Sequence, residues 1–444
     1  LFDTVRRYFE YKGYDVRYVS NFTDVDDKII NRAIEEEVTE AEIAKKYLEY
    51  FLECNQLLNT LPFNKMPKVT ENMEEMIDFI HALVERGYAY AVEGDVYFRI
   101  DKVREYGQLS GKRIEELEVG ARIAEDSKKE NPLDFVLWKK TDKGITWDSP
   151  WGAGRPGWHT ECVVMIQKEF KGKIDIHGGG TDLQFPHHEN EIAQSLCMHG
   201  HSIANYWMHV GRLGLNNEKM SKSRGNVINP DDIVNEFGAD TMRLYEMFIG
   251  DFEKAAAWSD NAVKGCKRFL DRVWNLAENL TEEAGCSKAN ESAVHKTIKK
   301  VSDDIEAMKF NTAIAALMAL VNDFYQNGCS KGDYAALLLM LSPFAPHMVE
   351  ELWETLGFAA EKGGMACQQS WPAYDASKTV DAEVNMAVQV CGKLRGTITV
   401  PVDSGEEAVV AAALADPKVQ KFTEGKKLVK TILVPNKLVN LIAK

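Results

Sequence analysis

The sequence has no long apolar run, no closely paired cysteines and no surplus of basic residues. Its longest apolar stretches, such as residues 314–321, are much shorter than the roughly 20 residues that a membrane-spanning helix needs. None of the eight cysteines lies in a CxxC pair, and no basic-then-apolar leader opens the chain. These absences argue against membrane-spanning and disulfide-stapled proteins, and we expect a cytoplasmic protein with reduced thiols.

The overall composition is typical of a globular protein. Of the 444 residues, 45% are hydrophobic and 27% are charged. At roughly 100–200 residues per domain, this length predicts two to four domains. The net charge is −15, from 53 basic and 68 acidic residues. An acidic chain can still bind nucleic acid where its basic residues are grouped, because salt screens charges beyond about 8–10 Å.

The N-terminal residues alternate between helical and extended patterns. Apolar spacing predicts a helix that includes Phe2 and Phe9, and alternation predicts a strand at residues 15–19. Thr39 and Glu42 have the spacing of a capping box, which predicts the start of another helix. Helices that alternate with buried strands are typical of an α/β fold with a parallel sheet.

The rest of the chain changes character twice. Residues 84–160 are richer in glycine, aromatic residues and short β-like runs, and we interpret them as an insertion. Helical periods dominate from about residue 240, and short strands return near the C-terminus. We therefore predict three domains, at residues 1–240, 241–375 and 376–444.

One group of residues has the chemistry of a metal site. His187 and Glu191 are four residues apart, so on a helix their side chains share one face. Together with the thiol of Cys162 they offer N, O and S ligands, the set that zinc binds. The spacing alone fits equally well a hydrogen-bonded core histidine and a small buried cysteine.

A glycine run lies between these ligands. Gly178 and Gly179, followed by Asp182, would let a nucleotide approach the backbone at the carboxyl edge of a sheet. The alternative is a turn in which the glycines adopt positive φ angles.

A second cluster of basic and hydroxyl residues occupies residues 219–223. Lys219 and Lys222 on a loop suit a clamp that neutralises charge during displacement at a phosphate. The alternative is a solvated basic loop without a ligand.

These clusters resemble the motifs of a known family. Residues 157–162, 175–191 and 219–223 resemble the class I aminoacyl-tRNA synthetases. Up to roughly residue 212 the resemblance is to cysteinyl-tRNA synthetase, and residues 21–30, 131–135 and 147–151 share it. From residue 219 onward the chain instead resembles the C-terminal half of leucyl-tRNA synthetase. The residues that carry this second resemblance are 219–232, 238–248, 309–316, 341–353, 388–401 and 427–439.

The chain departs from the family in two ways. It lacks the His-x-Gly-His motif that binds ATP, which by resemblance would precede Leu1 together with the first strand of the sheet. The fourth zinc ligand of the cysteine enzymes, a cysteine, would also lie upstream. The chain therefore looks N-terminally truncated and chimeric, through fusion or a mistaken join of two genes, and its catalytic activity is open to question.

The resemblance implies a fold for each predicted domain. Residues 1–240 would form the catalytic domain, with a Rossmann-like parallel sheet and the insertion. Residues 241–375 would form a helical anticodon-binding bundle, and residues 376–444 a small α/β tRNA-binding domain.

The resemblance also implies a reaction. The chain would form an aminoacyl-adenylate from ATP, with Mg²⁺, and would then transfer the amino acid to tRNA. One zinc ion would select cysteine by its thiolate, in a pocket that includes Trp158 and His177. Gly178, Gly179 and Asp182 would contact ATP together with Lys222, supported by Lys219. The alternatives are a leucine--tRNA ligase and a catalytically incomplete tRNA-binding fragment.

Two basic groups are candidates for tRNA contact in what we expect to be a monomer. Lys264, Arg268 and Arg272 form a stripe on a predicted helix that would bury Val263, Leu270, Val273 and Trp274. Residues 417–444 carry a net charge of +6 and include Lys426, Lys427 and Lys430. Phosphate contact is the natural interpretation of such a local excess. For the helical stripe, a solvated charged face is an equally good alternative.

Overall fold

The computed structural model describes all residues except 113–127, 216–217, 221–226 and 380–382. The chain divides into two compact units. The first contains Leu1–Glu278, Asp304–Met318 and Leu338–Trp371, and the second contains Asn279–Asp303, Ala319–Leu337 and Pro372–Lys444. The three-domain division at residues 240 and 375 stays a prediction.

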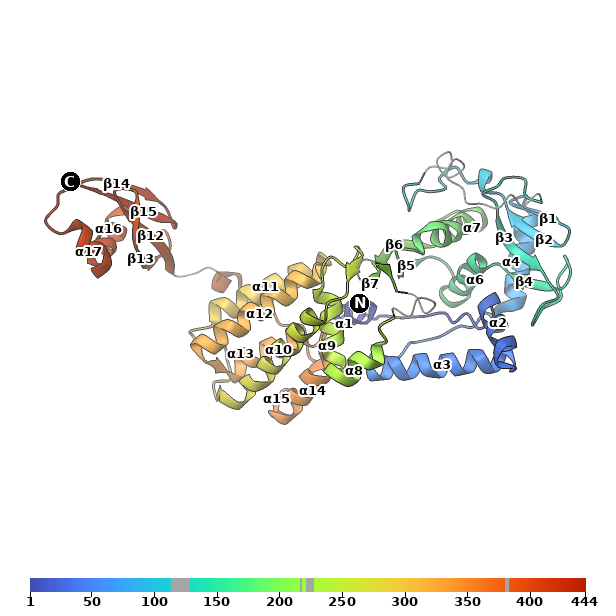
Figure 1. Cartoon of the computed structure of the whole chain (residues 1–444), viewed down its shortest axis with the longest axis horizontal. Coiled ribbons are helices and arrows are strands. Elements are labelled where there is room, and N and C mark those ends of the chain that lie inside the picture. Colours follow the sequence, from blue (N-terminus) through green and yellow to red (C-terminus); the bar gives the residue numbers. More distant parts are fainter. Residues whose placement is uncertain (113–127, 216–217, 221–226, 380–382) are drawn as a thin grey trace. The chain divides into compact units, whose positions relative to one another are not determined.

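Helices make up most of the regular secondary structure of the first unit (Figure 1). They are α1 (Phe2–Tyr11), α2 (Asp27–Glu36), α3 (Glu40–Leu57), α4 (Met73–Glu85), α6 (Trp158–Phe170), α7 (Glu189–His199), α8 (Pro230–Phe237), α9 (Ala239–Phe248), α10 (Asp260–Leu276), α14 (Pro346–Thr355) and α15 (Phe358–Lys362). The helix predicted at residues 2–9 and the capping box of Thr39 and Glu42 are confirmed. Among the described helices, none combines the length and apolarity that crossing a membrane requires.

The predicted insertion contains an antiparallel sheet. Its strands follow chain order, β1 (Ala89–Val92), β2 (Asp95–Phe98), β3 (Phe135–Lys140) and β4 (Gly154–Pro156). Phe98 and Trp138 are fully buried in the core that this sheet shares with α4 and α6. The sheet ends directly before α6, so it sets where that helix begins.

A parallel strand pair carries the next part of the chain. Strand β5 (Ile174–Gly180) pairs with β6 (Ala204–Val210) through the α7 crossover. The strand predicted at residues 15–19 is wrong, because within this segment Val19 alone forms a bridge to a described residue, Lys65. The physical reason is that the N–H of Tyr18 donates to the side-chain Oδ1 of Asn64 and not to a backbone carbonyl, so no regular ladder forms before Val19. Short strands β7 (Leu213–Leu215), β8 (Glu218–Lys219) and β9 (Ala256–Ala257) form a further small sheet.

Three helices have residues in both units. A short strand between the second and third of them pairs with a short strand that precedes all three. The helices are α11 (Glu291–Glu306), α12 (Phe310–Asn327) and α13 (Lys331–Leu341), and β10 (Leu280–Thr281) pairs with β11 (Cys329–Ser330). They agree with the helical periods expected after residue 240.

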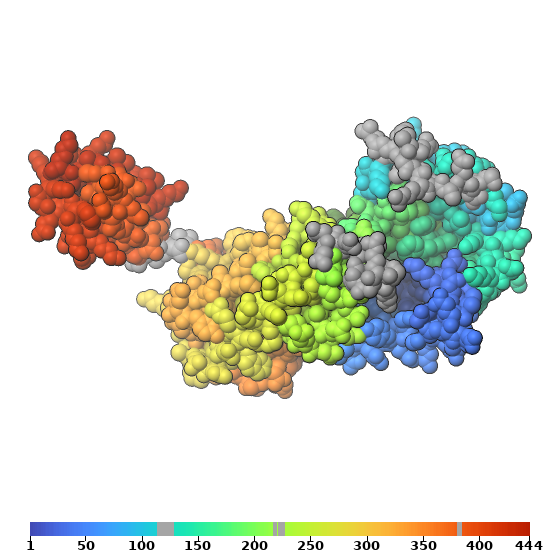
Figure 2. Space-filling view, viewed as in Figure 1, coloured from blue at the N-terminus to red at the C-terminus, as the bar shows by residue number. Residues whose placement is uncertain are grey.

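The C-terminal part of the second unit is a four-stranded sheet with two helices. It contains β12 (Glu383–Val390), β13 (Lys393–Pro401), α16 (Glu406–Ala415), α17 (Pro417–Thr423), β14 (Leu428–Val434) and β15 (Leu438–Ala443). The sheet order is β13-β12-β15-β14, and only the central pair is parallel. Its residues, red in the space-filling view, pack closely on one another around a core that includes Val388, Val409 and Leu441 (Figure 2).

Candidate metal centre and active site

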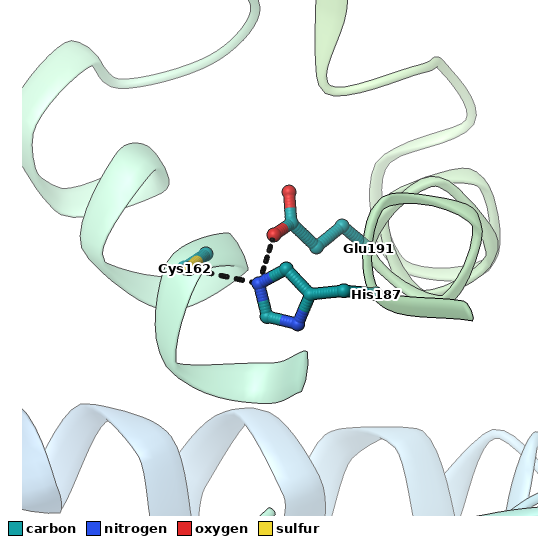
Figure 3. A group of neighbouring side chains, drawn as sticks. All are labelled: Cys162, His187 and Glu191. Atoms are coloured by element: carbon teal, nitrogen blue, oxygen red, sulfur yellow. Dashed lines mark hydrogen bonds and ion pairs between the residues drawn. The ribbon is translucent and has the colours of Figure 1, made fainter. Parts of the chain in front are cut away.

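Two packed helices bring the predicted metal ligands together (Figure 3). Cys162 lies in the second turn of α6, whereas Glu191 lies in the first turn of α7 and His187 in the wide turn before it. Gly157 lets α6 begin close to β3, because a Cβ there would lie 2.0 Å from the carbonyl oxygen of Val136. Cys162 precedes His187 by 25 residues, and His187 precedes Glu191 by one helical turn. The fold brings these three side chains around one point.

The three side chains form a buried S, N and O donor set. The Cys162 Sγ atom lies 3.5 Å from His187 Nε2, and that Nε2 lies 2.9 Å from Glu191 Oε1. The three ligand atoms all lie within 4.8 Å of one another. His187 Nδ1 contacts His159 Nδ1 at 2.8 Å, which leaves Nε2 as the atom directed at the cluster. A hydrogen-bonded core histidine would make the same contacts, so the role of His187 as a metal ligand stays a prediction.

Glu191 supplies the test of whether a metal fits. Its side chain is fully buried, and no hydrogen bond from the described residues reaches Oε1, although His187 Nε2 lies 2.9 Å away. A buried carboxylate oxygen without a hydrogen-bond donor is costly unless a cation or other partner satisfies it. Sulfur, nitrogen and oxygen ligands are the set that Zn²⁺ takes. The residues present therefore fit a zinc ion.

The second oxygen of Glu191 has a partner of its own. His177 Nε2 on β5 lies 2.7 Å from Glu191 Oε2, and the His177 ring stacks on Trp207 at 4.8 Å. Burial opposes ionisation of Glu191, but the His177 and His187 imidazoles hold the pKa of this carboxyl below its usual range. Glu191 in turn raises the pKa of His177 against the effect of burial.

Further imidazoles surround this centre and were missed in the sequence. His188 Nδ1 lies 2.8 Å from His209 Nε2, and His159 contacts His187. Burial lowers the pKa of His188 to about 3 and the pKa of His159 to about 4. The available signal was the two-residue spacing of Trp207 and His209, which places both on one face of a strand.

The glycine run has a packing role. A Cβ at Gly178 would lie 2.5 Å from the Phe2 ring, and one at Gly179 would lie 2.7 Å from His188 Cε1. Neither glycine has a positive φ angle, so the alternative of a positive-φ turn is wrong. Both belong to β5, and the missing side chains make room for rings. Contact of Gly178, Gly179 and Asp182 with ATP stays a prediction.

A cavity of about 1170 Å³ adjoins the cluster. Its lining includes Trp158, which is 50% exposed and stacks on the His187 ring at a centroid distance of 4.1 Å. Trp158 is therefore not a plain core tryptophan. Glu161 also lines the cavity, and burial raises the pKa of its carboxyl to about 8.

The lysine clamp is only partly within the described residues. Lys219 belongs to the short strand β8, which pairs with β7. Lys222 lies outside the described residues. A role for either lysine in binding phosphate stays a prediction.

The basic candidates for tRNA contact lie on two elements. On α10, Lys264 and Arg268 are exposed and Arg272 is half-buried, whereas Val263 and Val273 are buried as predicted. The prediction of a buried Trp274 is wrong, since its side chain is 43% exposed. It follows Asp271 by three residues, and so lies on the charged side of the helix.

The three C-terminal lysines are also exposed. Lys426 and Lys427 precede β14, and Lys430 lies on it. Their contact with tRNA stays a prediction, as does that of the α10 residues.

Comparison with known proteins agrees with this geometry. Residues 1–268 match the class I (C) catalytic domain of tRNA synthetases, and residues 288–410 match the anticodon-binding domain of tRNA ligases. The first match extends beyond residue 212, where the resemblance to the cysteine enzymes was expected to end. Assignment of the later residues to the leucine family stays a prediction.

The curated relatives are similar over most of the chain. The cysteine--tRNA ligase of Caldicellulosiruptor saccharolyticus is 43% identical over 368 residues, which are 80% of this chain and 77% of that protein. That of Carboxydothermus hydrogenoformans is 47% identical over 328 residues, covering 72% of this chain and 70% of the relative.

A solved structure supports the predicted fold class. The Mycobacterium tuberculosis methionyl-tRNA synthetase bound by methionyl-adenylate has a TM-score of 0.61, with 16% identity over 80% of this chain and 89% of its own. That likeness shows a shared fold alone, and the predicted class I α/β fold is confirmed. On the family match and these relatives, the chain belongs to the cysteine--tRNA ligase family of class I tRNA synthetases.

Proposed function

We propose that this chain activates cysteine with ATP and transfers it to tRNA. The observation that carries the proposal is the buried cluster of Cys162, His187 and Glu191, in which one carboxylate oxygen accepts no hydrogen bond from the part of the chain that the structure describes. The membership of the chain in the cysteine--tRNA ligase family supports the same reaction.

The three clustered side chains are the proposed ligands of one Zn²⁺ ion. When bound, zinc supplies a coordination position that suits a thiolate far better than the hydroxyl of serine. The burial of the ligands favours this role, because water is kept from competing for the site. Hydrogen bonds from outer residues orient such ligands. His177 would hold Glu191 in this way, and His159 would hold His187.

The remaining predicted site residues would act on the substrates. Trp158, half-exposed beside His187, would border the cysteine side chain. Gly178, Gly179 and Asp182 would contact ATP at the end of β5, with Mg²⁺ on the phosphates. Lys219 and Lys222 would neutralise negative charge as the cysteine carboxylate attacks the α-phosphorus and pyrophosphate leaves.

The final transfer requires tRNA, which the exposed lysines near β14 and the basic residues of α10 are proposed to bind. The cytoplasm is the proposed compartment. All eight cysteines are free thiols, as expected in a reducing environment.

Amino-acid-dependent exchange of pyrophosphate into ATP tests the proposal. We expect exchange with cysteine, none with serine or leucine, and loss of exchange when zinc is chelated. Exchange with leucine would overturn the assignment of the pocket. Absence of exchange with every amino acid would instead favour a tRNA-binding fragment.

A further inference from the structure

The thiol of Cys162 has a second polar neighbour besides His187. The side-chain amide of Asn21 donates a hydrogen bond to Cys162 Sγ, with Nδ2 and Sγ 3.8 Å apart. Asn21 belongs to the N-terminal segment, whereas Cys162 belongs to α6. The contact therefore joins the sulfur to a part of the chain that holds none of the three candidate ligands.

A bound metal would leave the Asn21 amide as a distinct partner of the sulfur. His187 Nε2 faces both Cys162 Sγ and Glu191 Oε1, so as a metal ligand it has no proton to give the sulfur. The amide of Asn21 carries two N–H groups and can donate to the sulfur without leaving its place. Hydrogen bonds from outer residues fix the direction of a ligand and tune the metal that it holds.

The segment that carries Asn21 is fastened on both sides of this residue. Parallel bridges join Val19 to Lys65 and Phe22 to Lys68, so the backbone of Asn21 lies between two tethered positions. Asn21 itself is exposed, and its position therefore depends on the backbone more than on burial of its own side chain.

Glu169 fastens the same segment to the helix of Cys162. It lies in the last turn of α6, its side chain is buried, and it forms ion pairs with Arg17 at 3.2 Å and Lys65 at 2.5 Å. Both partners belong to the bridged segments. The C-terminal end of α6 thus holds the backbone that carries Asn21. The Asn21 amide in turn contacts the sulfur of Cys162, which lies nearer the N-terminal end of the same helix.

We propose that Asn21 is a positioning residue of the metal centre, whose amide orients the Cys162 sulfur and strengthens retention of zinc. The inference rests on the proposed function, because it requires that the cluster of Cys162, His187 and Glu191 binds zinc. It adds a residue outside the ligand set whose effect is on the metal itself. The effect expected for such an outer residue is about 10- to 100-fold in metal affinity.

Competition with a chromophoric chelator measures zinc affinity in Asn21→Ala and Asn21→Leu variants. The second variant keeps the approximate size of the side chain, removes the donor and adds no metal ligand. Matched controls are Asn31→Ala and Asn31→Leu, which change an exposed asparagine of α2 whose amide oxygen accepts from Lys143. We expect both Asn21 variants to bind zinc at least about 10-fold more weakly than the wild type and the controls. Their free energy of unfolding without metal should stay close to that of the wild type, because Asn21 is exposed.

A spectroscopic readout separates positioning from folding. With Co²⁺ in place of zinc, the sulfur-to-cobalt charge-transfer band should shift in the Asn21 variants and not in the Asn31 variants. Unchanged zinc affinity and an unchanged band in both Asn21 variants would overturn this inference and leave the proposed zinc site intact. Failure of the wild type to bind zinc at all would overturn the proposed site as well.

Discussion

Oxygen Oε1 of Glu191 lies 2.9 Å from His187 Nε2, yet it accepts no hydrogen bond from any described residue. The same nitrogen lies 3.5 Å from the sulfur of Cys162. Sulfur, nitrogen and oxygen atoms thus converge in a buried space, and together they are the donor set that a zinc ion takes. The arrangement accounts for the proposed zinc site without reference to any other protein.

Glu189, in the first turn of α7, is expected to stabilise the turn that contains Gly107 and Ser110. Its buried carboxylate accepts hydrogen bonds from Gly107 N at 3.1 Å, Ser110 N at 2.7 Å and Ser110 Oγ at 3.0 Å. In Glu189→Gln an amide group must face one of these donors, so the free energy of unfolding in urea should fall by about 1.5–3 kcal/mol. Glu74→Gln, an exposed change on α4, should alter it by less than about 0.5 kcal/mol. Equal stability of the two variants would contradict this account.

Gly179 is predicted to be irreplaceable for steric reasons. Its Cβ would lie 2.7 Å from His188 Cε1, so Gly179→Ala must displace a buried ring and should cost about 1–3 kcal/mol. Gly265→Ala is a control for which we expect the opposite change in stability. It lies within α10, where the nearest contact is 3.8 Å away, and should stabilise the protein by about 0.5–1 kcal/mol. Thermal unfolding of both variants measures the difference, and a Gly179→Ala variant as stable as Gly265→Ala would argue against close packing.

Asp3 should make the first unit sensitive to acid. Burial opposes its ionisation, but Arg243 at 2.6 Å and Arg7 at 2.8 Å hold the pKa of Asp3 below its ordinary value of 3.8. Its contribution to stability is therefore present above pH 3.8 and lost as pH falls through the lower pKa of the folded state. Asp3→Asn should lower the free energy of unfolding by about 3 kcal/mol at pH 7.

The acid dependence provides the check on that ion pair. Urea titrations should show the difference between wild type and Asp3→Asn shrinking as the pH drops below 3.8. If the difference in the free energy of unfolding between the two proteins stays constant from neutral to acid pH, the charge of Asp3 is not the cause of the stabilisation.

The exposed C-terminal lysines should govern the salt dependence of tRNA binding. Replacement of Lys426, Lys427 and Lys430 by alanine removes three charges from the surface near β14. The slope of log affinity against log salt concentration should become shallower by about 2 to 3. Lys45→Ala on α3, an exposed lysine beside Glu49, should leave the slope unchanged. Filter binding across salt concentrations measures it, and an unaltered slope in the triple variant would exclude phosphate contact by these lysines.

Part of the candidate metal cluster was predictable because two of its residues follow a local rule, whereas the approach of Cys162 to them depends on the packing of α6 on α7. His187 and Glu191 are one turn apart, and that spacing is visible in the sequence. The imidazoles of His188 and His209 were not predictable as a pair, since their contact depends on where β6 lies beside α7. Asn21 was hidden for the same reason, because its segment reaches Cys162 only through tertiary contacts with α6.

The errors in the fold also have local causes. Alternation at residues 15–19 resembles a strand, but a strand needs regular backbone partners, and the N–H of Tyr18 donates to the side-chain Oδ1 of Asn64 instead. Trp274 is apolar enough for a core, yet its position on α10 faces the charged side. The local sequence pattern misleads in both cases, because hydrogen-bond partners decide whether a strand forms and the helix face decides whether a side chain is buried.

Zinc content tests the central claim most directly. After dialysis against zinc-free buffer, the protein should retain about one zinc ion per chain, and Cys162→Ser should retain none. Cys197→Ser, which removes a half-buried thiol of α7 outside the cluster, should retain the metal. Full zinc content in Cys162→Ser, or none in the wild type, would contradict the assignment of this centre as the site that selects cysteine.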